Sequence, residues 1–163
     1  MNICFFHGLE SDGPGRKGAW LERLDWQVYA PVIDYRDPHC VREVWNEAIS
    51  QKRDAFVGSS MGGWMATLLG THTRVPCWLV NPAVIERSFE PLFPAPLGVE
   101  RPVIHLLQGK EDELIPPKKA LKWFEDQRFK PSITEVNAGH RIAPEYFQEW
   151  IHQILSSTKE RCE

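Results

Sequence analysis

Six short apolar runs alternate with helical segments along the chain, and this order limits the folds that the sequence can adopt. The runs lie at 3–6, 28–32, 55–58, 77–80, 102–107 and 132–136. Short apolar runs that stop at a loop are typical of buried strands. Strands that alternate with helices predict a parallel sheet, because each right-handed crossover lays its helix on a face of the sheet. We therefore expect an α/β fold of about six mostly parallel strands with helices on both faces.

Helices are expected between most of these strands. They are predicted at 19–24, 37–49 and 62–69, from 116 onward, and at 144–155. The second is the clearest, because Asp37 and Pro38 form a good helix start and an apolar face follows at helical spacing. The members of that face are Val41, Val44, Trp45, Ala48 and Ile49. The proline-rich segment 83–101 is predicted to be a loop, and Pro31 places the second strand near an edge of the sheet.

Length and composition fit a single domain spanning 1–163. The chain of 163 residues is 42% hydrophobic and 25% charged with a net charge of -3, which is ordinary for a globular protein. It has no basic stripe that would contact nucleic acid and no apolar stretch long enough to cross a membrane. With no basic region before the short apolar start, a signal peptide is not expected, and we expect a cytoplasmic protein. No HExxH motif or Cys/His ligand spacing is present, so neither a metal nor a cofactor is expected.

The motif Gly-Ser-Ser-Met-Gly at 58–62 lies between a predicted strand and a predicted helix. In this setting GxSxG forms a sharp turn that exposes a nucleophilic serine. Ser60 has a glycine two residues away on each side, whereas Ser59 does not, so Ser60 is the predicted nucleophile. The backbone N–H of Met61 would then stabilise the oxyanion, aided by the positive end of the following helix.

With this motif the chain resembles the α/β-hydrolase superfamily over nearly its whole length. The sequence Phe6-His7-Gly8-Leu9 is similar to the HG loop that follows the first strand in these proteins. The resemblance implies that the N–H of Leu9 is the second oxyanion donor and that His7 orders the loop. The alternative for His7 is a role as the catalytic base.

The resemblance also supplies an acid and a base. The segment 107–116 resembles the acid loop of the superfamily and places the acid at Asp112, with Glu111 and Glu113 as competitors in the same loop. Asp34 is a further alternative acid, but it precedes the nucleophile in the chain. His140, after the last strand, stands where the superfamily has its base, which gives the chain order Ser, acid, His.

Within the superfamily the chain looks like the compact bacterial YqiA-type esterases, with a GSSxGG elbow and little or no cap domain. The resemblance implies that the first two strands of the full eight-stranded hydrolase sheet are absent. The segment 83–101 stands where larger relatives insert a lid. Its apolar residues are expected either to line an acyl pocket or to form the buried side of a loop: Phe89, Leu92, Phe93 and Leu97.

These features predict a serine esterase or thioesterase that acts on a small acyl ester through an acyl-enzyme. Acyl transfer to an acceptor other than water would use the same residues. A non-catalytic binding protein on a hydrolase scaffold is the alternative from another class, because fold alone does not establish function. The acyl chain, the leaving group and the oligomeric state are not specified by the sequence.

Overall fold

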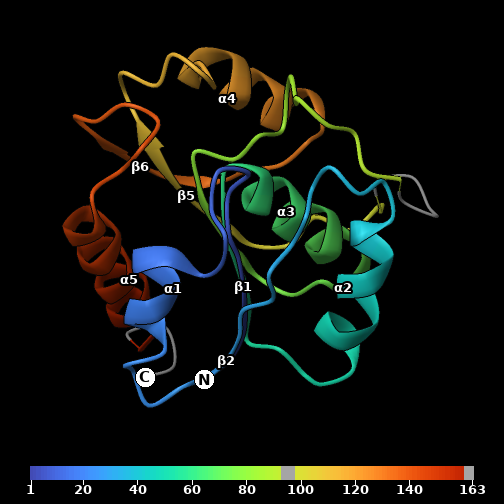
Figure 1. The fold of residues 1–163 in the computed structure, drawn as a ribbon. Helices are drawn as coiled ribbons and strands as arrows, with labels where there is room; N and C mark the ends of the chain where they lie inside the picture. Colours follow the sequence, from blue (N-terminus) through green and yellow to red (C-terminus); the bar gives the residue numbers. More distant parts are fainter. Residues whose placement is uncertain (93–97, 160–163) are drawn as a thin grey trace.

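A computed structural model describes residues 1–92 and 98–159 of the chain, and its strands form one parallel sheet (Figure 1). Within this part there are six strands: β1 (Asn2–Phe6), β2 (Gln27–Tyr29), β3 (Ala55–Ser59), β4 (Cys77–Val80), β5 (Ile104–Gly109) and β6 (Ser132–Val136). Their order across the sheet is β2-β1-β3-β4-β5-β6, and all five pairings are parallel. The predicted α/β fold is confirmed, and β2 lies at an edge, as Pro31 indicates.

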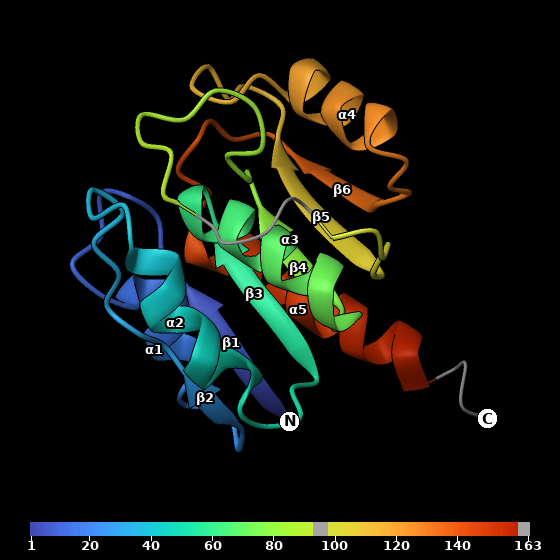
Figure 2. The ribbon, with the colours of Figure 1, turned by 90° about the vertical axis from the view of Figure 1, so that its right-hand side faces the viewer.

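Helices cover both faces of this sheet. They are α1 (Gly15–Leu21), α2 (Cys40–Ile49), α3 (Met61–Thr73), α4 (Pro117–Asp126) and α5 (Pro144–Lys159). Figure 2 looks onto the face that carries α2, α3 and α4, with α1 and α5 behind the sheet. Among the described residues, no helix combines the length and apolar character needed to cross a membrane.

The two faces have separate cores because neighbouring residues of each strand point to opposite sides. On β1, Cys4 and Phe6 pack in the core beneath α2, α3 and α4, whereas Ile3 and Phe5 pack in the core beneath α1 and α5. Central strands are therefore buried on both sides. This explains why the sequence shows continuous apolar runs rather than alternation of polar and apolar residues.

The strand order creates a topological switch point at the carboxyl ends of β1 and β3. The chain passes from β1 outward to β2 and then returns to add β3 on the other side of β1. The loops that follow β1 and β3 consequently diverge, and open parallel sheets bind their ligands at such a switch point. The predicted nucleophile motif follows β3, and the predicted HG loop follows β1.

Helix α1 begins at Gly15, four residues earlier than predicted. The Gly/Pro-rich stretch before residue 19 predicts a loop, since glycine and proline normally interrupt helices. Here Gly18 is buried against β1, and a Cβ on it would lie 3.0 Å from the ring of Phe5. Glycine therefore allows the helix to lie close to the strand instead of ending it.

The bounds of α2 and β5 also differ from the prediction. Asp37 forms a turn before α2, accepting the His39 N–H at its carboxylate over 2.8 Å, and the helix begins at Cys40. Ile49, assigned to the apolar face of this helix, is 42% exposed, so that assignment is wrong. Strand β5 starts and ends two residues later than expected. Its end extends past the apolar run because it includes Gln108, which is polar but fully buried.

The segment predicted to be a loop, 83–101, forms neither helix nor strand at the residues described, 83–92 and 98–101. Residues 83–92 follow β4 at the carboxyl ends of the strands, where Figure 2 shows them above the start of α3.

Candidate active site

Ser60 stands at a sharp turn between β3 and α3. Its backbone has φ 55° and ψ -118°, a conformation that L residues rarely adopt and that costs on the order of 1–3 kcal/mol. The surrounding backbone holds it there: the Ser60 N–H donates to the Val80 carbonyl over 2.9 Å, and the Ser60 carbonyl accepts the Ala83 N–H, also over 2.9 Å. The elbow that the motif predicts is thus locked to the end of β4.

Two glycines of the motif are required by close packing. A Cβ on Gly62 would overlap the backbone carbonyl of Phe6, and a Cβ on Gly58 would overlap the backbone of Gly62. The first turn of α3 can therefore lie directly against the end of β1. This contact brings the loop after β1 beside the nucleophile, since a Cβ on Gly8 would lie 3.4 Å from the Cβ of Ser60.

The structure brings the three residues of the predicted triad together. His140 Nε2 lies 3.1 Å from the hydroxyl oxygen of Ser60, and His140 Nδ1 lies 2.9 Å from Oδ2 of Asp112. An ionised carboxylate accepts the proton on Nδ1, which leaves Nε2 as an acceptor for the serine hydroxyl. The arrangement can therefore carry a proton from Ser60 to the imidazole.

Asp112 is buried, with 0% of its side chain exposed, whereas 20% of the His140 side chain is exposed. Its other oxygen, Oδ1, accepts the N–H groups of Leu114 at 3.0 Å and Ile115 at 2.8 Å. These contacts compensate for burial of the carboxylate and aim its remaining oxygen at His140.

The competing acids lie elsewhere. Glu111 and Glu113 flank Asp112 but are exposed to solvent. Asp34 is also exposed, and its carboxylate accepts the N–H of Arg36 over 3.0 Å. Of the four carboxylates considered, the structure places Asp112 against His140.

His7 is tied to the backbone at both ring nitrogens. Its Nε2 accepts the Ile33 N–H over 2.8 Å, so Nδ1 carries the proton and donates it to the Gly8 carbonyl at 2.7 Å. The Tyr35 hydroxyl donates to the His7 carbonyl over 2.7 Å. The ring is 1% exposed and holds the loop after β1 to the segment after β2, which is the ordering role expected of it.

Leu9 and Met61, the predicted oxyanion donors, both have free backbone N–H groups. Within 1–92 and 98–159, neither N–H donates to a protein acceptor. Met61 opens the 13-residue helix α3, whose first N–H groups carry the positive end of the helix dipole. Both amides are therefore unpaired within the described part of the chain, and Met61 directly follows Ser60.

Asn81 is a residue of this region that the sequence reasoning missed. It follows β4, is 0% exposed and has a positive φ of 41°. Its amide group donates to the carbonyls of Gly139 and His140, and its oxygen accepts the N–H of Gly109. The signal in the sequence is slight: a single asparagine after a fully apolar strand, where a turn residue is expected in any case.

The segment after β4 lies near the first turns of α3. Arg87 stacks over the ring of Trp64 with its guanidinium carbon 5.0 Å from the ring centre, and it pairs with Glu90 at 2.7 Å. Leu92 is 59% exposed, and Phe89 lies beneath the guanidinium of Arg36. The two other residues suggested for an acyl pocket, Phe93 and Leu97, lie outside the described residues.

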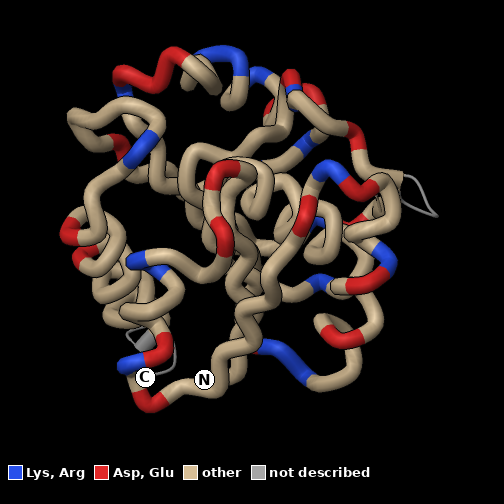
Figure 3. Tube along the Cα trace, viewed as in Figure 1, with Lys and Arg blue, Asp and Glu red and all other residues tan. Residues whose placement is uncertain are grey.

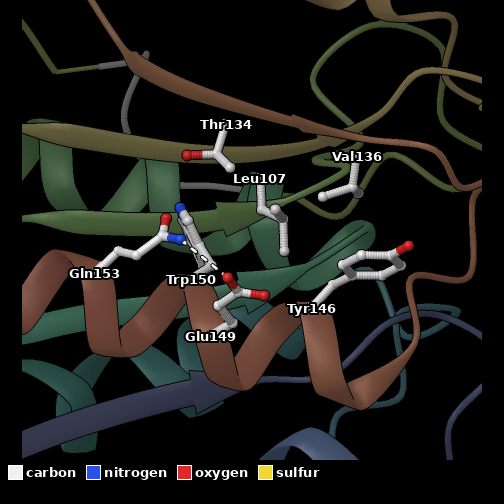
Figure 4. Close-up of a pocket in the computed structure, with 7 residues that line it drawn as sticks. All are labelled: Leu107, Thr134, Val136, Tyr146, Glu149, Trp150 and Gln153. Carbon is white, nitrogen blue, oxygen red and sulfur yellow. Dashed lines mark hydrogen bonds between the residues drawn. The ribbon is translucent and has the colours of Figure 1, made fainter.

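Two hollows occur away from the triad. One, of about 150 Å³, lies between α5 and the strands β5 and β6, with Leu107, Val136 and Trp150 among its lining residues (Figure 4). The other, of about 470 Å³, lies at the amino ends of β3 and β4, beside Ile49 and Arg53. Neither is lined by Ser60, Asp112 or His140.

Three cysteines among the described residues are free and buried: Cys4, Cys40 and Cys77. Burial raises the pKa of Cys4 to about 12 and that of Cys40 to about 11. Thiols with raised pKa values are poor nucleophiles, so these residues act as small apolar side chains. Figure 3 shows acidic and basic residues interspersed around the molecule.

Comparison with known proteins was made on sequence and on structure. The model of an uncharacterised protein family, UPF0227, matches residues 2–94, which is more than half of the chain. No curated protein matches.

Several solved structures share the fold. A protein from Xanthomonas campestris pv. campestris whose name places it in the α/β superfamily of hydrolases is 22% identical, with a TM-score of 0.70, covering 96% of this chain and 98% of that one. Est1E from Butyrivibrio proteoclasticus is 12% identical with a TM-score of 0.70, covering 96% and 87%. Acyl-protein thioesterase 2 from Zea mays is 15% identical with a TM-score of 0.66, covering 95% and 92%.

At these identities the structural likeness establishes the fold and leaves the activity to be argued from the site. It confirms the resemblance to the α/β-hydrolases that the motif at 58–62 indicates. From the family match and the shared architecture we conclude that this chain belongs to the UPF0227 family and has the α/β-hydrolase fold.

Proposed function

We propose that this protein is a serine hydrolase, an esterase or thioesterase, in which Ser60, His140 and Asp112 form the catalytic triad. The observation that carries the proposal is the continuous chain of contacts from the Ser60 hydroxyl through His140 to the buried Asp112. A serine hydroxyl is a weak nucleophile until a base takes its proton, and this chain supplies the base and its orienting acid.

The reaction proceeds in two stages. Nε2 of His140 takes the Ser60 proton as the serine oxygen attacks the carbonyl carbon of the ester. The negative oxygen that forms is stabilised by the N–H groups of Leu9 and Met61. His140 then donates its proton to the leaving alcohol or thiol, which departs and leaves an acyl-serine. A water molecule, deprotonated by the same imidazole, attacks this acyl-serine, and the imidazolium returns the proton to the Ser60 oxygen as the acid is released.

Asp112 contributes by holding His140 in the tautomer that the reaction needs. A buried carboxylate against Nδ1 also stabilises the imidazolium that forms in both stages. The two backbone N–H donors to Oδ1 fix the direction of this carboxylate.

The neighbours in fold support an ester-type substrate. They include esterase PE8 and an acyl-protein thioesterase, and one structure of Est1E holds ferulic acid. A small acyl ester or thioester is accordingly the substrate class that we propose.

Labelling with a fluorophosphonate probe tests the proposal, because the probe reacts only with an activated serine. We expect one adduct per chain on the folded wild type, none on Ser60→Ala, and an adduct on the matched control Ser59→Ala. Turnover of p-nitrophenyl esters and acyl thioesters should follow the same pattern. A folded wild type that takes no probe and hydrolyses none of these esters would refute a serine hydrolase.

A further inference from the structure

The turn after β4 lies between the two halves of the proposed triad. On one side the backbone of this turn pairs with both backbone groups of Ser60. The Val80 carbonyl accepts the Ser60 N–H, and the Ala83 N–H donates to the Ser60 carbonyl. The packing is tight as well, because a Cβ on Gly63 would lie 2.7 Å from the Cβ of Pro82. The position of this turn is thus fixed relative to Ser60.

On the other side the same turn reaches the loop that carries His140, through the side chain of Asn81. Its Nδ2 donates to the His140 carbonyl at 2.8 Å and to the Gly139 carbonyl at 3.2 Å. One amide group therefore holds the carbonyls of two consecutive residues, one of which is the proposed base itself.

The orientation of this amide is fixed from the other end. Oδ1 of Asn81 accepts hydrogen bonds from the Gly109 N–H at 2.8 Å and from Nε2 of Gln108 at 3.0 Å, both at the end of β5. The backbone N–H of Asn81 donates to the Leu107 carbonyl at 3.1 Å. With 0% exposure, the side chain has no water to exchange with, so its donors and acceptors must remain paired with these partners.

From these contacts we infer that Asn81 is a positioning residue that sets the distance between Ser60 and His140. It ties the His140 loop to the strand end that already holds the nucleophile and to the strand, β5, that leads into Asp112. This inference rests on the proposed function, because the distance matters only if His140 acts on Ser60. A displacement of about 1 Å in such a geometry can lower the rate by roughly 10²-fold.

The backbone at this position allows a clean substitution. Because φ is 41° at Asn81, alanine would add strain, whereas glycine adopts this conformation readily. Asn81→Gly therefore removes the side chain and leaves the turn intact. Asn81→Asp is the second variant: it keeps an oxygen for the Gly109 N–H but has no N–H to donate to the His140 loop.

Arg53→Met is the matched control. Arg53 is also buried and also donates to backbone carbonyls, those of Ala48 and Glu47, but it lies at the opposite end of the sheet. The Arg53→Met substitution is expected to lower the melting temperature and to leave kcat and KM unchanged. Any general effect of losing a buried hydrogen-bonded side chain is measured by this variant.

The experiment measures kcat and KM for an activated ester together with the low-field proton resonance of the His140 Nδ1–H. We expect Asn81→Gly and Asn81→Asp to lower kcat by about 10- to 100-fold, with KM within about twofold, and to broaden or shift the resonance. If Asn81→Gly does not fold, Asn81→Asp decides by the same measurements. Folded variants that keep the wild-type kcat, or that keep the wild-type resonance, overturn the inference.

Failure of the proposed function would look different. In that case the wild type itself would show no turnover and no probe adduct. The resonance needs no substrate, so it would still report whether Asn81 holds His140 against Asp112. A wild-type resonance that persists unchanged in both variants overturns the inference whether or not the protein is an enzyme.

Discussion

The two ends of the sheet are each held by a buried polar side chain, and the two differ in what they hold. At the carboxyl end Asn81 joins the ends of β4 and β5 to the loop of His140. At the amino end Arg53 donates to carbonyls in the last turn of α2 and, at 2.6 Å, to the side chain of Asn2, the first residue of β1. Asn81 thus supports loops that carry the proposed chemistry, whereas Arg53 connects a helix end to a strand. Hydrogen bonds from a buried side chain to backbone carbonyls thus position the proposed triad at one end of the sheet and stabilise the fold at the other.

The largest expected effect is at the carboxyl end, from His140→Ala. Removing the base should lower kcat/KM by about 10⁴-fold or more, because Ser60 loses its proton acceptor. The substitution also leaves Oδ2 of the buried Asp112 without its partner, so we expect the melting temperature to fall by roughly 2–12 °C. Ester hydrolysis measures the change in kcat/KM, and thermal unfolding measures the change in melting temperature. If the variant keeps wild-type turnover, His140 is not the base, and the carboxyl end of the sheet does not hold the catalytic site that we propose.

The pair Asp112→Asn and Asp34→Asn tests which carboxylate supports the base. An amide at 112 favours the wrong tautomer of His140, so we expect kcat to fall by roughly 10³- to 10⁴-fold. Asp34→Asn should leave kcat within about twofold, because Asp34 is exposed and contacts Arg36. Steady-state kinetics of both variants decides between them. The reverse order of effects would reassign the acid.

At the amino end, Arg53→Met should change stability alone. The substitution removes charge-assisted hydrogen bonds and leaves two helix-end carbonyls without this donor, which costs about 2–4 kcal/mol of unfolding free energy. For a chain of this size the melting temperature then falls by roughly 4–16 °C. Urea unfolding measures the first and calorimetry the second. If kcat also falls in the folded variant, the amino end of the sheet affects activity as well as stability, and the proposed difference between the two ends is wrong.

Lys17→Met gives the smallest expected effect and sharpens the role of Asn81. Lys17 donates to the Ile142 carbonyl at 3.1 Å, two residues beyond His140, so kcat should fall by no more than about threefold. A loss as large as that of Asn81→Gly would show that α1, rather than the turn after β4, positions His140.

The same variant has a predictable pH dependence. Burial lowers the pKa of Lys17, so the folded state disfavours its charged form. The penalty is full below the folded pKa and disappears as the pH rises to the value in the unfolded chain. Any stability gained by Lys17→Met at pH 7 should therefore shrink at pH 10, as urea unfolding at the two pH values would show.

Much of the fold is predictable from the sequence because its strands are buried on both faces. Continuous apolar runs mark β1, β3 and β4, and the elbow at Ser60 is specified by glycines that local packing requires. The start of α1 is not predictable in this way. Glycine in a sequence normally indicates the end of a helix, whereas Gly18 lies inside α1 and allows its close contact with Phe5.

The site is predictable where a residue has a local motif or a resemblance to follow. Ser60 has the elbow, and Asp112 and His140 follow from the resemblance to the hydrolases; the structure brings all three into contact. Asn81 has neither. Its importance comes from partners 28 and 59 residues away in the chain, and such contacts exist only after the strands have assembled.

The purely parallel pairing of the sheet has a consequence for folding. Ser60 and His140 are 80 residues apart, and no hairpin can bring them together, because each parallel strand needs a long crossover before it can pair. Contacts of such high sequence separation form slowly and late. Recovery of probe labelling during refolding should therefore lag behind recovery of helical signal. Labelling of Ser60 would then serve as a kinetic marker for the placement of His140 and its loop beside the nucleophile.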